Sequence, residues 1–189
     1  DIIHKKNVKY FFENAKKAKL SATKTLSAGE KISVISKTIV SDIATTSELG
    51  AGKRRVAHLL GMYGTILFWI GSAIMIFCYS SPSSDTPSFW PIIWHVGAIM
   101  TVVGGSWFWF FLRVDVYSEA HPWYRIIKAD LFVLALIASS LFGLIWSCLQ
   151  SLDLNDRWDD KVFLVLYIIS NFVLFGGVYW SKFAHMFYK

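Results

Sequence analysis

Residues 131–149 read LFVLALIASSLFGLIWSCL, and this stretch decides the fold. It carries no charged side chain over 19 consecutive residues. A helix that crosses the apolar core of a bilayer, about 30 Å thick, needs about 20 mostly apolar residues. A helix of a small soluble bundle keeps a polar face toward water, and this stretch has none. It therefore predicts a membrane-spanning helix.

Three further blocks of similar character surround it. Together they predict an all-α membrane protein, a four-transmembrane-helix bundle with spans over residues 56–79, 89–112, 129–149 and 162–185. Many of the nine tryptophans lie at the ends of these blocks, which is where Trp and Tyr form belts at the two bilayer surfaces. We divide the chain into a basic amino-terminal arm, residues 1–52, and a transmembrane domain, residues 53–189.

The charged residues predict an orientation. Twelve Lys and Arg precede the first span, three lie between the second and third spans, and two follow the fourth. The other side has only Arg157 and Lys161, among several aspartates. By the positive-inside rule we expect both termini in the cytoplasm and a multi-pass protein of the plasma membrane. The chain starts at an aspartate, so we also expect it to be processed or trimmed.

The basic arm contains a line of isoleucines at helical spacing: Ile32, Ile35, Ile39 and Ile43. This pattern favours an amphipathic helix on the bilayer surface or on a partner, although a solvated basic tail is the alternative. Residues 50–52, Gly-Ala-Gly, break the chain before Lys53 begins the transmembrane domain.

Several functional classes are excluded by what the sequence lacks. Two cysteines, Cys78 and Cys148, cannot hold an iron–sulfur cluster or a zinc ribbon alone. Both fall at the outer ends of their spans, and we favour unpaired thiols over a disulfide. No nucleophile–base set or phosphate loop is visible, so we expect no catalysis by this chain alone and no nucleic-acid partner.

Three histidines lie within the predicted spans, and their depths differ. His58 and His185 both lie near the cytoplasmic end, whereas His95 lies on the order of 15–20 Å deeper, at 1.5 Å per residue. His58 and His185 can therefore meet around one ligand. Histidine is a standard axial ligand of haem iron, and ionisable groups within spans are usually functional. The alternative is that both histidines only touch lipid headgroups.

The surroundings of the two histidines favour a flat cofactor. Gly61 lies near His58 and Ser181 near His185, and small residues let a ring approach. Basic residues at the same level are potential partners for haem propionates: Arg54, Arg55, Arg125, Lys128 and Lys182.

Other polar residues are weaker candidates. We expect His95 to serve helix packing rather than a quinone headgroup, and Asp130 to form an interfacial ion pair rather than a proton or quinone site. Asn171 is expected to form a hydrogen bond to another helix. Gly104 and Gly105 are expected to permit close packing of helices. His121 is a remote alternative haem ligand.

Two motifs resemble one known family. Residues 53–64, KRRVAHLLGMYG, are similar to a helix opening in cytochrome b subunits of the nitrate reductase gamma type. Residues 179–188, YWSKFAHMFY, resemble the end of that family's last helix, with its Ser-Lys/Arg-x-x-His pattern. Related domains occur in membrane subunits of quinone-interacting and heterodisulfide-reductase-like oxidoreductases. Two-haem members have further histidines where this chain has Phe68 and Tyr167, so the resemblance implies one haem.

The resemblance implies a function in electron transfer. It predicts a membrane-anchoring subunit that relays electrons between a quinone and soluble iron–sulfur or flavoprotein subunits. One haem b, held by His58 and His185, is the predicted cofactor. The alternative is a haem-free accessory or scaffold subunit of a membrane enzyme.

Overall fold

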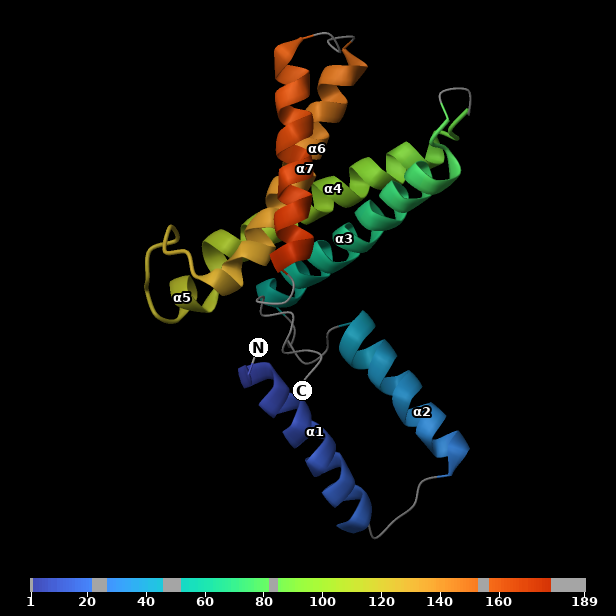
Figure 1. Cartoon of the computed structure of the whole chain (residues 1–189), viewed down its shortest axis with the longest axis vertical. Coiled ribbons are helices and arrows are strands. Elements are labelled where there is room, and N and C mark those ends of the chain that lie inside the picture. The colour runs from blue at the N-terminus through green and yellow to red at the C-terminus, as the bar shows by residue number, and fades with distance from the viewer. Residues whose placement is uncertain (1, 22–26, 46–51, 82–84, 153–156, 178–189) are drawn as a thin grey trace.

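The structure is a computed structural model, and we describe it over residues 2–21, 27–45, 52–81, 85–152 and 157–177 (Figure 1). It contains four helices long and apolar enough to cross a membrane. They are α3 (Lys53–Cys78), α4 (Phe89–Trp107) with its π-helical continuation η3 (Phe108–Leu112), α6 (Leu131–Ser151) and α7 (Trp158–Gly177). An all-helical bundle with four such helices, as the apolar blocks predict, is thus confirmed.

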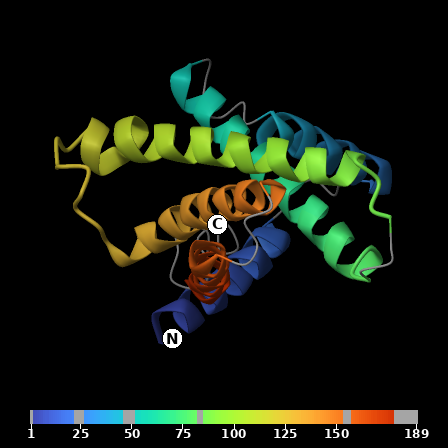
Figure 2. The ribbon, with the colours of Figure 1, turned by 90° about the horizontal axis from the view of Figure 1, so that it is seen from above.

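The four helices form two antiparallel hairpins that cross. Helix α3 packs along α4, and α6 packs along α7, while α4 and α6 join the two pairs (Figure 1). Seen from above, the segment that connects η3 to α6 lies beyond the ends of those helices (Figure 2). We call the end of the bundle that contains Lys53, Arg113 and Leu131 the basic end.

Glycines bring α3 and α4 into backbone contact. A Cβ atom at Gly97 of α4 would lie 2.4 Å from the backbone nitrogen of Phe68 on α3. A Cβ at Gly104 would lie 2.5 Å from the nitrogen of Gly61. Side chains as small as hydrogen are therefore needed here. The predicted role of Gly104 and Gly105 in close packing is confirmed, since a Cβ at Gly105 would meet Ile137 at 2.7 Å.

Two helices precede the four apolar helices. Helix α1 spans Ile2–Ser21, and α2 spans Ala28–Thr38 before a π-helical turn, η1 (Ile39–Ala44). Ser27 and Glu30 form a capping box that starts α2, each side chain accepting a backbone N–H at the helix start. The isoleucine line predicts α2, and Ile32, Ile35 and Ile39 are all exposed. Helix α1, which has no such line of isoleucines, was not predicted.

The fourth apolar helix differs from its predicted limits. It starts at Trp158, four residues before the predicted start at Val162. Asp159 and Asp160 lie in its first turn, where carboxylates interact favourably with the positive end of the helix dipole. Hydropathy alone places these aspartates outside the helix. The last eight residues of the predicted span, 178–185, lie outside the described residues.

Candidate functional site

His58 lies one turn into α3, on an exposed side of that helix. The buried side of α3 consists of Ala57, Gly64, Phe68 and Gly71, which face α4. At 100° per residue, Met62, Thr65 and Trp69 follow His58 along the same side of the helix. The imidazole is therefore directed away from the α3–α4 interface.

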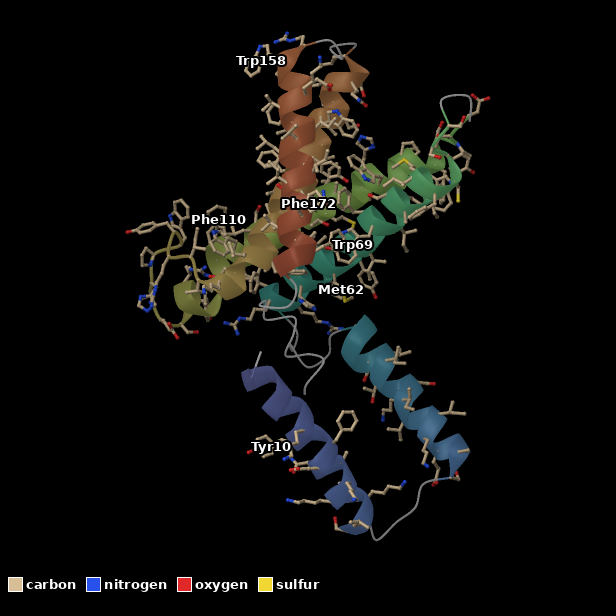
Figure 3. The ribbon with its side chains drawn as sticks, viewed as in Figure 1. Tyr10, Met62, Trp69, Phe110, Trp158 and Phe172 are labelled. Atoms are coloured by element: carbon tan, nitrogen blue, oxygen red, sulfur yellow. The ribbon has the colours of Figure 1, made fainter. Side chains whose placement is uncertain are left out.

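The side of α3 that carries His58 meets α7 deeper in the bundle. The rings of Trp69 and Phe175 are 5.5 Å apart, centroid to centroid. Trp69 also packs against the buried cluster of Phe132, Ala135 and Leu174 (Figure 3). Phe175 lies in the last turn of α7 that the structure describes. The side of α3 that carries His58 therefore faces the carboxyl end of α7.

Gly61 leaves open space beside His58. No heavy atom lies within 4 Å of the position that a Cβ would occupy at Gly61. The Gly61 carbonyl accepts a hydrogen bond from the Thr65 hydroxyl at 2.7 Å, so Thr65 is satisfied within its own helix. The side of Gly61 toward which a Cβ would point is therefore open.

The predicted basic residues are arranged around the basic end. The Arg54 guanidinium lies 4.8 Å from the centre of the Tyr117 ring. Arg55 donates from Nε to the carbonyl of Thr45 at 2.8 Å, which links η1 to α3. Arg125 and Lys128 are exposed in the segment before α6. None of these contacts neutralises a cation with a carboxylate.

The second half of the predicted site lies in the last part of the chain. Ser181, Lys182 and His185 fall outside the described residues, so the pairing of His58 with His185 stays a prediction. Among the described residues, no group of three or more His, Cys, Asp or Glu side chains is arranged to hold a metal ion.

His95 serves helix packing, as expected. Its Nδ1 lies 2.6 Å from the carbonyl oxygen of Pro91, and its Nε2 lies 2.9 Å from the hydroxyl of Ser147 on α6. A carbonyl only accepts, so Nδ1 carries the proton and Nε2 accepts from the serine. Nε2 thus joins α4 to α6, while Nδ1 is satisfied within α4.

Asp130 forms the expected ion pair, but with a residue that the sequence analysis did not single out. Its Oδ2 lies 2.7 Å from Nη1 of Arg113, and both side chains are buried. Lys128, its neighbour in sequence, is exposed. Asn171 was expected to hydrogen-bond to another helix. Its Nδ2 instead donates to the carbonyl of Tyr167 on its own helix at 2.8 Å.

A polar network deeper in the bundle was missed by the sequence analysis. The indole N–H of Trp94 donates to the Ser72 hydroxyl at 2.9 Å, which joins α4 to α3. The hydroxyl of Tyr167 on α7 interacts with the side chains of Ser72 and Asn171. Ser72 lies four positions after the buried Phe68, which places it on the buried side of α3. A serine at this spacing is the sequence signal for such a contact. Cys78 and Cys148 are exposed free thiols, as expected.

Comparison of the chain with known protein families, curated proteins and solved structures found no match. The resemblance to cytochrome b subunits therefore rests on the two short motifs at residues 53–64 and 179–188.

Proposed function

We propose that this chain is a cytochrome b-like membrane subunit that carries one b-type haem between His58 and His185. It anchors a larger redox complex and relays electrons between a membrane quinone and soluble iron–sulfur or flavoprotein subunits. A haem in this position would accept and release one electron at a time.

The observation that carries the proposal is the contact between Trp69 and Phe175, which sets α3 against α7. His58 precedes Trp69 by 11 positions, about 16 Å toward the basic end at 1.5 Å per residue. If the fourth span extends to His185 as the sequence predicts, His185 follows Phe175 by 10 positions, about 15 Å along that helix. Each histidine then lies at about the same distance along its own helix from the Trp69–Phe175 contact, which supports a common site for the two imidazoles.

The described residues around His58 fit a flat, anionic cofactor. The exposed imidazole points away from α4, and the space at Gly61 lies one turn along the same helix. In this proposal His58 supplies one axial nitrogen, and Gly61 lets the ring approach α3. Arg54 and Arg55, at the end of the same helix, offer positive charge to propionates; Arg–carboxylate pairs are among the strong hydrogen bonds of proteins.

We further propose that α3, α4 with η3, α6 and α7 are inserted in the plasma membrane. Their length and apolar composition support insertion. The basic residues at the basic end support a cytoplasmic location for that end and for both termini.

A reduced-minus-oxidised visible spectrum of the detergent-purified complex tests the haem. We expect the bands of a low-spin b haem, lost in His58→Ala and in His185→Ala and kept in His95→Ala. His58 is exposed, so its replacement removes few contacts within the protein, and the variant should still fold and assemble. Gly61→Phe fills the open space beside His58 and should also remove the haem without unfolding the chain.

A spectrum without haem bands in the wild-type complex refutes the cytochrome proposal. A haem signal that survives both His58→Ala and Gly61→Phe places the cofactor elsewhere. With no haem in the assembled complex, the haem-free scaffold subunit is the function that remains.

A further inference from the structure

The segment between η3 and α6 is fastened by a buried arginine. The side chain of Arg113, just after η3, is fully buried. Its Nη1 donates to Oδ2 of Asp130 at 2.7 Å, and its Nη2 donates to the carbonyl of Arg125 at 2.6 Å. The guanidinium also lies over the Trp109 ring, 4.1 Å from its centre. Arg113 thus ties the end of the second span to the start of the third.

This fastening fixes the backbone just before α6. Besides pairing with Arg113, Asp130 accepts the backbone N–H of Ile127 at 3.1 Å. The backbone is therefore held at residues 125 and 127, and the side chains there are exposed. A buried ion pair of this kind is costly to break from one side, because the remaining charge stays buried. The surface shaped by the pair is consequently preorganised.

Five exposed side chains of η3 and of this segment are together called the loop patch: Phe110, Trp123, Tyr124, Arg125 and Lys128. Phe110 is 43% exposed on η3, the continuation of an apolar helix. The Trp123 ring lies 5.5 Å from that of Phe110, and the Tyr124 ring lies 5.8 Å from that of Trp123. Arg125 and Lys128 follow in the sequence and are exposed. Along the chain the patch therefore runs from apolar through aromatic to basic.

This order of side chains matches the chemistry of a bilayer surface. Acyl chains contact apolar side chains, Trp and Tyr lie at the headgroup level, and basic residues attract anionic headgroups. Two carboxylates of the segment are engaged elsewhere: Asp130 binds Arg113, and Glu119 lies 3.5 Å from His121. Neither of them offsets the charge of Arg125 or Lys128.

We propose that the loop patch binds an anionic phospholipid, with its phosphate at Arg125 and Lys128 and its acyl chains along Phe110 and Trp123. The inference rests on the proposed insertion in a membrane, but not on the haem. It also gives Arg125 and Lys128 a role different from pairing with haem propionates. The continuity of the patch with the apolar surface of η3 favours a lipid over a soluble protein as its occupant.

Native mass spectrometry of the full-length complex in detergent tests the proposal by titration with phosphatidylglycerol and phosphatidylcholine. The wild type should bind phosphatidylglycerol more tightly. The double variant Arg125→Gln/Lys128→Gln should weaken that binding about 30-fold, because each basic side chain near an anionic surface contributes about fivefold. Both side chains are exposed, so the variant should fold.

The matched control is Arg157→Gln/Lys161→Gln, which removes the same charge from exposed positions at the opposite end of the bundle. It should leave the preference for phosphatidylglycerol unchanged. Asp130→Asn keeps both cations of the patch but breaks the fastening, and it should also lower the preference.

Equal binding by the wild type and Arg125→Gln/Lys128→Gln overturns the proposal, as does an equal loss in the control, which would indicate overall charge alone. Release of a soluble subunit with unchanged lipid binding would instead make the patch a protein-docking surface. The visible spectrum of the same samples reports the haem separately, so lipid selectivity without haem bands leaves this proposal standing while the cytochrome proposal fails.

Discussion

Replacing Gly97 by alanine tests the crossing of α3 and α4. The added Cβ would lie 2.4 Å from the nitrogen of Phe68, 2.8 Å from the carbonyl oxygen of Gly64 and 2.9 Å from the carbonyl carbon of Leu67. All three are backbone atoms, so no side-chain rotation relieves the overlap. Ordinary contact begins at 3.4 Å, so the helices must separate by about 1 Å there.

The expected loss follows from two opposing terms. Overpacking of a well-packed interior costs about 1–3 kcal/mol, and contact with backbone on three sides places this site near 3 kcal/mol. Alanine recovers about 1 kcal/mol of helix propensity relative to glycine. The net loss is about 2 kcal/mol. For a chain of this size, 1 kcal/mol shifts the melting temperature by roughly 2–4 °C, which gives a decrease of roughly 4–8 °C.

Thermal unfolding in detergent, followed by circular dichroism, measures the effect. The matched control is Gly176→Ala on α7, where no heavy atom lies within 4 Å of the new Cβ. The control should melt at the wild-type temperature or slightly above it. If Gly97→Ala is as stable as Gly176→Ala, then α3 and α4 do not meet through Gly97, and the derived packing is wrong.

Two further predictions concern the basic end. Asp130→Asn should destabilise the protein by about 3–5 kcal/mol, because it leaves Arg113 buried without its carboxylate. The double variant Arg113→Met/Asp130→Leu should restore most of the stability in the same melting assay. Comparable melting temperatures for Asp130→Asn and the double variant would contradict this. The orientation is tested in a background of Cys78→Ser/Cys148→Ser. Cysteines introduced at Ser83 and Asn155 should react with an impermeant maleimide added to intact cells, and a cysteine in the arm should not. The reverse pattern would show that the proposed orientation is inverted.

The four apolar helices could be predicted from the sequence because their signal is local. A stretch such as residues 131–149 needs no partner to reveal that it is apolar on every side. The start of α7 was misplaced because hydropathy counts only apolar character. Asp159 and Asp160 lower the hydropathy, yet the positive end of the helix dipole stabilises their charge.

The polar contacts could not be predicted, because they depend on distance between segments. Arg113 and Asp130 are 17 positions apart; Arg113 follows η3 and Asp130 precedes α6, so nothing in the sequence pairs them. Lys128, two positions from Asp130, is the nearer choice in sequence but is exposed. Ser72 and Trp94 meet only because α3 and α4 pack through glycine.

The glycine crossing also gives a physical reason for expecting one haem rather than two. Phe68 occupies the position where two-haem members of the family that the motifs resemble carry a second histidine, and it is 1% exposed. Its backbone nitrogen is the atom that a Cβ at Gly97 would strike at 2.4 Å, and its ring lies 5.2 Å from that of Trp94. That side of α3 is filled by α4 at this depth, so a porphyrin would have to separate the two helices there. The side that carries His58 is exposed instead, and the Cβ position of Gly61 is open although its backbone nitrogen packs against Gly104. A second haem at Phe68 would therefore require α3 and α4 to part, whereas the single haem proposed beside His58 would not.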